Sequence, residues 1–252
     1  MCSDVLPWAV FRAVLCTVVL SVLCRDVQAQ RPFDGTDAAV VGKGKFELEA
    51  GIGGRRGVGV DSIATPSTTG SYGLSADTEV AFGAELQHHL AASASGERNS
   101  LAETELMAKH VYLHGELQDS PGPSVAVQCA ILLPELNGAN RFGEACTAIA
   151  SIRWKGVTSH VNLGLARLRD HTAARTANLM LEGSSAWALA PVAELVAESD
   201  HGGNQLRSAL IGMVYRRSTR LSLDVGVRHA RATTGDFNEV RLGISLEFDT
   251  GE

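Results

Sequence analysis

Few residues in this sequence have the types and spacing that catalysis or metal binding requires. The sequence contains no nucleophile elbow, HExxH pattern, phosphate-binding loop or dinucleotide fingerprint, and residues 51–57 resemble only a glycine-rich loop. His88 and His89 could bind a metal, but adjacent strand residues point in opposite directions, which favours solvated histidines. No Cys or His spacing fits a zinc site. We therefore expect no catalytic residue, no metal and no cofactor.

Two cysteines, Cys129 and Cys146, have a more informative spacing. They lie almost symmetrically about residues 135–141 and would face each other if the flanking segments form a hairpin. In an oxidising compartment they could form a cross-strand disulfide. The alternative is that they are two small apolar side chains, and the sequence leaves both interpretations open.

The start of the chain indicates export. Residues 13–24 (AVLCTVVLSVLC) form an apolar run, and residues 25–29 end in the small residue Ala29, so we expect a signal peptide over residues 1–29. The run is shorter than the ~20 apolar residues of a membrane-spanning helix, although Asp4 weakens the basic start and leaves a retained anchor open. Leu23 before Cys24 argues against a lipid anchor.

Composition then excludes several protein classes. The net charge of −6 argues against nucleic acid as a partner, because a phosphate-binding surface would be basic. Beyond the leader no apolar run approaches the length of a spanning helix, which excludes a helical membrane protein. The remaining chain is long enough for one domain.

From Lys45 onward, polar and apolar residues alternate with a period of two. Residues 45–52 (KFELEAGI) place apolar side chains on one face of a strand and charges on the other, and residues 221–228 and 240–248 repeat the pattern. Turn signals divide the chain into about twelve segments of a length that suits tilted strands crossing a bilayer. The expected strands are 44–54, 61–73, 78–88, 103–113, 122–134, 142–154, 157–167, 175–186, 189–198, 205–216, 219–230 and 237–248.

The connectors between these segments alternate in length. Tight turns are expected at 75–77, 155–156 and 217–218, and longer loops at 53–60, 89–102, 135–141, 168–174 and 199–204. Short turns on one side and long loops on the other are typical of outer-membrane barrels. Residues 114–121 break the rule, because their connector should be short.

Aromatic residues support the same interpretation. They gather near the short-turn ends of the segments, as one girdle of an aromatic belt would. The belt residues are Phe46, Tyr72, Tyr112, Trp154, Trp187, Tyr215 and Phe248. The alternative is the general preference of aromatic residues for strands.

We therefore predict an all-β fold: a transmembrane, antiparallel, up-and-down β-barrel of about 12 strands after a cleaved signal peptide. Residues 30–43 are expected to be a short periplasmic segment and residues 44–252 the barrel. The main competitor is a soluble sandwich or lipocalin-type barrel. The polar face alternates charge with glycine, as in Glu49–Gly51 and Arg241–Gly243, which favours a crowded lumen.

Four polar residues fall on the predicted lipid face. Glu144, Arg207 and His229 lie toward the loop ends, where a charge that faces lipid costs little free energy. His110 does not lie toward a loop end, so its position on this face is less favourable. An outer-membrane phospholipase would need a serine beside a histidine on this face, and His229 has no well-placed serine.

Several stretches resemble a known family. The final strand, residues 241–248 (RLGISLEF), resembles the C-terminal signal of outer-membrane barrels, although four residues follow its aromatic. Residues 31–37 with 44–51, then 105–109, 191–195 and 212–216, resemble the outer-membrane transporter family named for the MetA pathway of phenol degradation. The resemblance implies passage of aromatic or other hydrophobic compounds, and it assigns no catalytic or ligand residue.

The predicted lumen is rich in charge. Its candidate residues are Glu47, Glu49, Glu85, Glu105, Lys109, Arg153, Glu194, Glu198, Asp224, Arg228, Arg241 and Glu247. Buried charges are costly unless paired or hydrated, so the interior is either a salt-bridged plug or a narrow wet channel. These charges could also serve only to fill the barrel, and otherwise the carboxylate excess favours cations or polar neutral solutes.

The leading functional hypothesis is a Gram-negative outer-membrane channel for small molecules. The expected partners are outer-membrane lipid and lipopolysaccharide, the barrel-assembly machinery acting on the C-terminal strand, and small solutes. The alternatives are a non-conducting structural or loop-presenting barrel and a soluble periplasmic protein.

Overall fold

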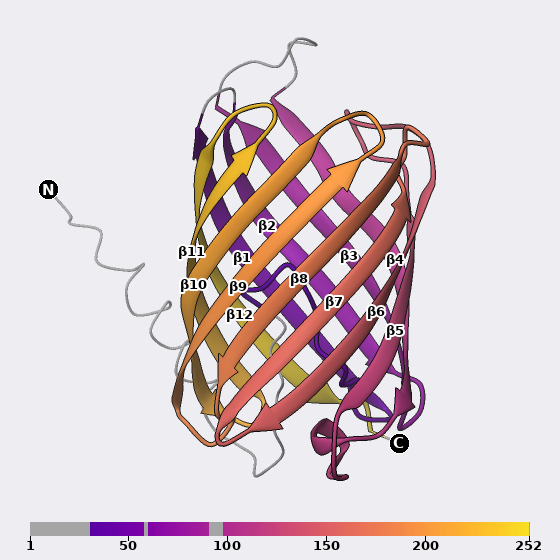
Figure 1. Ribbon diagram of the computed structural model, residues 1–252, viewed down its shortest axis with the longest axis vertical. Coiled ribbons are helices and arrows are strands. Elements are labelled where there is room, and N and C mark those ends of the chain that lie inside the picture. Colours follow the sequence, from indigo (N-terminus) through magenta and orange to yellow (C-terminus); the bar gives the residue numbers. More distant parts are fainter. Residues whose placement is uncertain (1–30, 58–59, 91–97, 252) are drawn as a thin grey trace, which may run out of the picture.

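The computed structural model describes residues 31–57, 60–90 and 98–251, and the expected signal peptide lies outside these residues. The described chain forms twelve antiparallel strands that close into one barrel (Figure 1). The strands are β1 Lys45–Gly57, β2 Val60–Gly73, β3 Thr78–His89, β4 Asn99–Leu113, β5 Ser124–Leu132, β6 Gly143–Trp154, β7 Val157–Arg167, β8 Ala173–Gly183, β9 Leu189–Asp200, β10 Gln205–Ser218, β11 Leu221–Ala232 and β12 Phe237–Asp249, with one 3-10 helix, η1 Glu116–Gln118. The predicted fold class is confirmed.

Each strand pairs with its neighbours in sequence, and β1 pairs with β12 to close the barrel. The first and last strands align from Lys45 opposite Asp249 to Gly57 opposite Phe237. Because closure pairs every strand on both sides, no edge is left open.

Burial alternates along the strands with the predicted period of two. In β11, the side chains of Ser222, Asp224 and Arg228 are buried, whereas those of Val225 and Val227 are exposed. The polar face therefore points into the barrel and the apolar face points outward, which is the reverse of a soluble ligand-binding barrel.

The connectors differ from the prediction in four places. Residues 53–57 continue β1 rather than starting a loop, because Arg55 points inward and pairs with Glu239 of β12. The connections 168–172 and 201–204 are also shorter than expected, and β4 begins at Asn99. The alternation of connector length is therefore weaker than the sequence suggested.

We call the end with the β2–β3, β6–β7 and β10–β11 turns the short-turn end and the opposite end the loop end. The C-terminus and η1 lie at the short-turn end, at the bottom of Figure 1. The 114–121 connector, which broke the predicted pattern of connector lengths, contains η1. It is long because η1 contacts residues inside the barrel.

Candidate functional site

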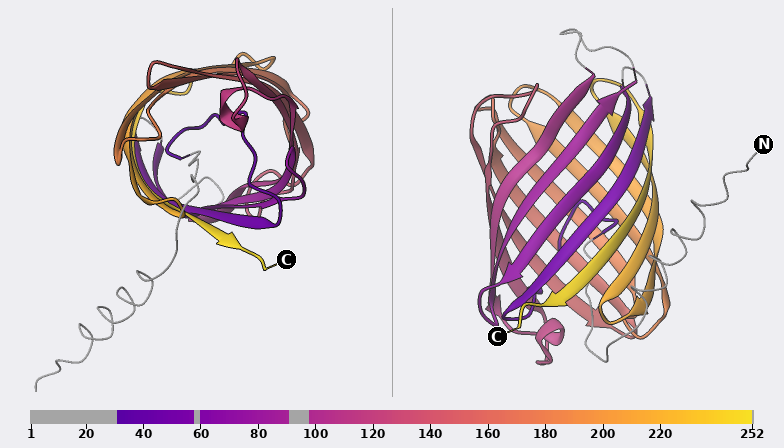
Figure 2. Two further views of the ribbon diagram at one scale, coloured as in Figure 1. Left: turned by 90° about the horizontal axis from the view of Figure 1, so that it is seen from below. Right: turned by 180° about the vertical axis from the view of Figure 1, so that it is seen from behind.

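Residues 31–43, which we call the plug, lie inside the barrel (Figure 2). They run from the start of β1 at the short-turn end up into the lumen. The sequence predicted a short periplasmic segment here. The structure places it in the lumen instead, because side chains of the wall bind its backbone and side chains along most of its length.

The upper part of the plug docks through Asp34. Its carboxylate bridges Arg228 of β11 and Arg241 of β12, with 2.6 Å between Arg241 Nη1 and Asp34 Oδ1. Glu194 of β9 accepts the backbone amides of Asp34, at 3.0 Å, and of Gly35, at 2.9 Å. Burial acts to raise the pKa of Asp34, but the two arginines outweigh burial and hold that pKa below its ordinary value.

The middle of the plug is held by neutral side chains of the wall. Asn162 of β7 makes two hydrogen bonds with Thr36: its Oδ1 accepts the Thr36 amide and its Nδ2 donates to the Thr36 carbonyl, both at 2.8 Å. Ser151 Oγ of β6 accepts the Ala38 amide at 3.0 Å. An amide side chain and a hydroxyl thus replace the strand partner that an extended backbone would otherwise need.

The lower part of the plug meets a buried ion pair. Lys109 of β4 and Glu79 of β3 lie 3.0 Å apart, and both side chains are almost fully buried. Glu79 accepts the Val41 amide at 2.7 Å, and Lys109 Nζ donates to the Ala39 carbonyl at 3.0 Å. The plug therefore supplies the further hydrogen bonds that buried charges require.

Two apolar patches inside the lumen complete the docking. Phe33 packs on Val192, Leu210 and Val214 of β9 and β10. Lower down, a second patch seats Ala38, which is fully buried. This patch consists of Ala38, Val111, Ala126 and Ile149, with Val40 and Leu117 packed against it.

The η1 connector folds under the plug, which explains why it is long. Leu117 joins the lower apolar patch, and Gln118 Nε2 donates to the Ala38 carbonyl at 2.8 Å. Glu116 Oε2 accepts the amide of Arg153, at 2.8 Å, and so ties η1 to β6. In Figure 2, viewed from below, η1 lies across the barrel opening beside the plug.

Glycines of the lumen face make room for the top of the plug. Gly51 of β1 and Gly243 of β12 stand directly opposite each other. A Cβ on either one would overlap the guanidinium of Arg31, which pairs with Asp224 at 3.7 Å. The alternation of glycine with charge therefore reflects space for the plug as well as a narrow lumen.

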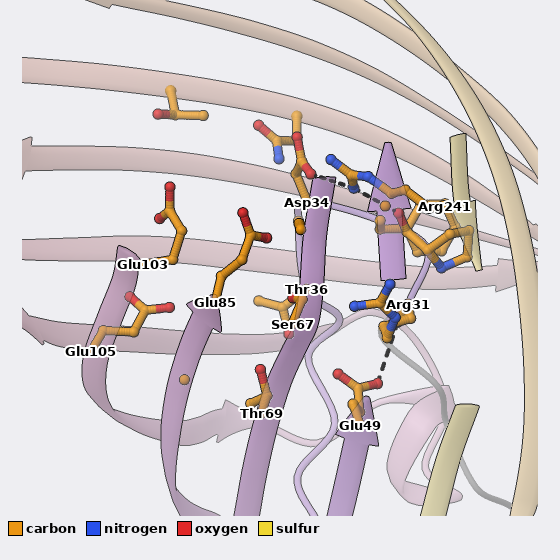
Figure 3. A pocket seen from close by; sticks show the side chains of 18 of the residues that line it. Arg31, Asp34, Thr36, Glu49, Ser67, Thr69, Glu85, Glu103, Glu105 and Arg241 are labelled. Atoms are coloured by element: carbon orange, nitrogen blue, oxygen red, sulfur yellow. Dashed lines mark hydrogen bonds and ion pairs between the residues drawn. The ribbon is translucent and has the colours of Figure 1, made fainter. Parts of the chain in front are cut away.

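Above the plug, a polar cavity of about 720 Å³ reaches toward the loop end. Four of the carboxylates that line it form no ion pair within the described chain: Glu85, Glu103, Glu105 and Glu198. The lining arginines are all paired, namely Arg31, Arg55, Arg169, Arg228 and Arg241. Figure 3 shows Glu85, Glu103 and Glu105 on one side of the cavity and Arg31 and Arg241 on the other. The lining contains seven carboxylates and five arginines, so it has a formal excess of negative charge.

The structure brings most predicted lumen residues into this arrangement. Glu49, Lys109, Glu194, Asp224, Arg228 and Arg241 contact the plug, and Glu85, Glu105 and Glu198 line the cavity. Glu47 is buried, Glu247 pairs with Lys45 at 2.6 Å, and Arg153 lies beside η1.

Sequence reasoning missed several lumen charges. Arg55 and Glu239 continue the inward alternation of β1 and β12, and Glu79 continues that of β3, so the period alone could have found them. Glu103 could not be found this way, because it lies at a register shift in β4 with a φ of 52°. Arg31 and Asp34 belong to the plug, for which the sequence carries no periodic signal.

The outward face carries the remaining predicted features. The aromatic residues all lie at strand ends or turns of the short-turn end: Tyr112 and Trp154 are each 70% exposed, and Phe46 pairs with Tyr72 and Phe248 in register. Trp187, Tyr215 and Phe248 are also exposed.

Cys129 and Cys146 stand opposite each other on β5 and β6 and form a disulfide, also on the outward face. His110, which seemed misplaced on that face, hydrogen-bonds Thr78 at 2.8 Å and packs edge-on against Tyr112. His88 lies 2.7 Å from Asn99, and His229 pairs with Asn238 rather than with a serine.

One chain of groups has the residue types of a hydrolytic triad. Ser151 Oγ lies 2.8 Å from His160 Nδ1, and His160 Nε2 lies 3.8 Å from Glu182. Ser151 and His160 are almost completely buried, and Ser151 already accepts the Ala38 amide. The plug covers the Ser151 hydroxyl. While the plug is docked, His160 therefore orients this hydroxyl toward the Ala38 amide, and no substrate can reach it.

Within the described residues, no helix has the length and apolarity needed to cross a membrane. No protein-family model matches the chain. No curated protein matches it either.

Solved structures match the barrel along most of its length. The NanC porin has a TM-score of 0.60 at 8% identity over 79% of this chain and 98% of its own. An outer-membrane channel from Pseudomonas putida F1 also reaches 0.60, at 12% identity over 86% of this chain and 100% of its own. The KdgM porin in complex with disordered oligogalacturonate reaches 0.53, at 11% identity over 80% of this chain and 99% of its own. The chain therefore has the fold of outer-membrane channels and porins.

Proposed function

We infer that this protein is an outer-membrane channel for small molecules whose lumen is closed in its short-turn half by the plug. The observation that carries this proposal is the docking of residues 31–43 on the lumen charges, beneath an open polar cavity. A barrel interior that holds both a polar cavity of about 720 Å³ and a segment docked through side-chain contacts is suited to gated passage.

The outward face supports placement in the outer membrane. Large apolar side chains such as Leu163, Leu195 and Ile211 are more than half exposed around the barrel, and a surface of this kind in water would aggregate. The aromatic girdle at the short-turn end would then lie at the periplasmic interface, with the loop end outside the cell. Export by the signal peptide and assembly through the C-terminal strand belong to the same proposal.

The cavity favours cationic or polar solutes. Among the described residues, Glu85, Glu103, Glu105 and Glu198 form no ion pair while the lining arginines are paired, so a permeating cation would be stabilised and an anion repelled. The family resemblance, to transporters named for phenol degradation, points to aromatic compounds instead. An aromatic solute that carries an amine would fit both the charge of the cavity and the family resemblance. Measured permeability to cations, polar solutes and aromatic compounds decides which class of solute passes.

The test is to tether the plug to the wall. Ala38→Cys with Ser151→Cys joins two positions whose atoms now hydrogen-bond at 3.0 Å. In planar bilayers we expect low or intermittent conductance from the parent barrel, none from the oxidised double variant, and recovery with reductant. The single Ala38→Cys variant is the matched control, because it carries the same plug substitution and cannot be tethered.

Cation preference is read from the same recordings as a reversal potential in a salt gradient. A permeability ratio of potassium to chloride above one supports the role of the cavity carboxylates. Equal conductance of the double variant in its oxidised and reduced forms would show that the plug does not close the lumen.

The second candidate is a barrel that conducts nothing. It is favoured by the density of docking contacts, in which charged, neutral and apolar groups all hold the plug. Absence of conductance both in the parent barrel and in a variant with a weakened plug would establish it.

A further inference from the structure

A groove of about 610 Å³ lies on the outward face of the barrel at the loop end, across β7 to β10. Its floor consists of the small outward residues Ala177, Ala197 and Ser199. Leu163 and Leu165 of β7 form one wall and are 60% and 72% exposed. An apolar trough of this shape on a lipid-facing surface fits a hydrocarbon chain.

Two arginines stand at the loop-end mouth of this groove. Arg175 of β8 and Arg207 of β10 are both exposed and line it. Arg175 Nε donates to Ser199 Oγ at 2.8 Å, which fixes its guanidinium over the groove. Within the described residues neither arginine forms an ion pair with a carboxylate.

The surrounding charges do not neutralise the pair. Arg207 stands opposite Arg231 of β11, whose only carboxylate neighbour among the described residues is Asp236 at 4.0 Å. Glu144, an outward carboxylate of β6, stands opposite Arg167. Glu198 borders the groove but also lines the lumen cavity, and Asp200 at the end of β9 binds Asn204. Like charges directly across a sheet destabilise it, so the cluster gains from an anionic ligand.

We propose that this groove binds an anionic lipid, with Arg175 and Arg207 on its phosphate and an acyl chain along Leu163 and Leu165. Guanidinium groups bind phosphate through paired, charge-assisted hydrogen bonds. A free phosphate would leave the trough empty, and a neutral lipid would leave the arginines without a counter-ion. This inference rests on the proposed membrane placement but uses the outer wall rather than the lumen.

The experiment is native mass spectrometry of the detergent-purified barrel titrated with bisphosphorylated lipid A. Dephosphorylated lipid A and inorganic phosphate are the two comparison probes, since they separate the acyl and phosphate contributions. Arg175→Gln with Arg207→Gln should weaken binding of the phosphorylated lipid about tenfold for each arginine. Ala197→Trp, which fills the trough and keeps both arginines, should weaken it too.

Arg56→Gln with Arg98→Gln is the matched control. Both arginines are exposed at the loop end, on the other side of the barrel, and the double substitution removes the same charge. Equal loss of binding in test and control variants, or inorganic phosphate bound as tightly as the lipid, would overturn the proposal. Conductance of the same variants should be unchanged, so failure here is distinguishable from failure of the proposed channel.

Discussion

Asp34 contacts side chains from three strands of the wall at once. Its carboxylate meets Arg228 and Arg241, and its amide is bound by Glu194. Arg228 is almost fully buried and is also paired with Glu194 at 3.5 Å and with Glu239 at 3.7 Å, so Asp34 supplies the one carboxylate of the plug among the three around this guanidinium. We therefore expect Asp34 to contribute a large share of the free energy that docks the plug.

Asp34→Asn should release the plug. Loss of the charge-assisted contacts is expected to weaken docking by about 2 kcal/mol, which corresponds to about thirtyfold faster hydrogen exchange of amides 35–41. Asp37→Asn is the control, because the Asp37 carboxylate accepts the Ala39 amide within the plug and, among the described residues, forms no ion pair with the wall. Identical exchange in the two variants would show that the arginine contacts do not hold the plug.

The same substitution gives a pH test. Arg241 and Arg228 outweigh burial and hold the pKa of Asp34 below its ordinary value, so its ionised form stabilises docking at pH values above that ordinary value. The difference in exchange between the parent protein and Asp34→Asn should stay constant from neutral pH down to about 4 and vanish as pH falls through the lowered pKa. A difference that disappears near pH 6 would contradict this assignment.

At the scale of elements, the η1 connector and the β5–β6 hairpin support the plug and the wall around it. The plug and η1 meet at one apolar patch, so the irregular connector serves as a floor for a segment far away in sequence. The β5–β6 hairpin, which follows η1, is closed by the Cys129–Cys146 disulfide. The bond joins β5 to β6 three residue pairs from Ala126 and Ile149, on the loop-end side of the floor.

Removing this disulfide should destabilise the barrel. The cysteines are 17 residues apart, and a closed loop of that size is worth about 3 kcal/mol in the chain-entropy view. Urea unfolding in lipid vesicles, followed by tryptophan fluorescence, should show the loss on adding reductant. The Cys129→Ala/Cys146→Ala variant should be weaker from the start and insensitive to reductant, and free thiols in the purified parent would refute the bond.

At the scale of the whole molecule, the barrel is inverted relative to a soluble protein. Its interior holds paired charges and a docked segment, and its exterior is an apolar belt. This arrangement is stable only if the surroundings of the belt are themselves apolar.

Ile211→Arg tests those surroundings. Ile211 is 69% exposed on the middle of β10, where a charge facing lipid costs about 2–4 kcal/mol. Phe142→Arg, at the loop end and 61% exposed, should cost about 0–1 kcal/mol. Refolding equilibria in lipid vesicles measure both, and equal, small costs would mean that the belt does not face lipid.

The sequence by itself determined the wall of this protein. Alternation with a period of two placed Glu49, Glu194 and Arg241 inward and Ile211 outward, because neighbouring strand residues point to opposite faces. It also predicted about twelve strands and indicated that Cys129 would face Cys146, since a hairpin aligns residues that lie symmetrically about its turn. Whether the two cysteines are bonded was left open by the sequence, and the structure shows the disulfide.

Only the tertiary structure decided what fills the lumen. Residues 31–43 have no periodic pattern, and their partners Glu79, Asn162 and Glu194 lie on strands distant in sequence that meet only when the barrel closes. The same holds for the groove between Arg175 and Arg207, which needs the register of β8, β9 and β10. Local alternation specifies which way a side chain points, but contacts across a closed barrel depend on the register and closure of all the strands.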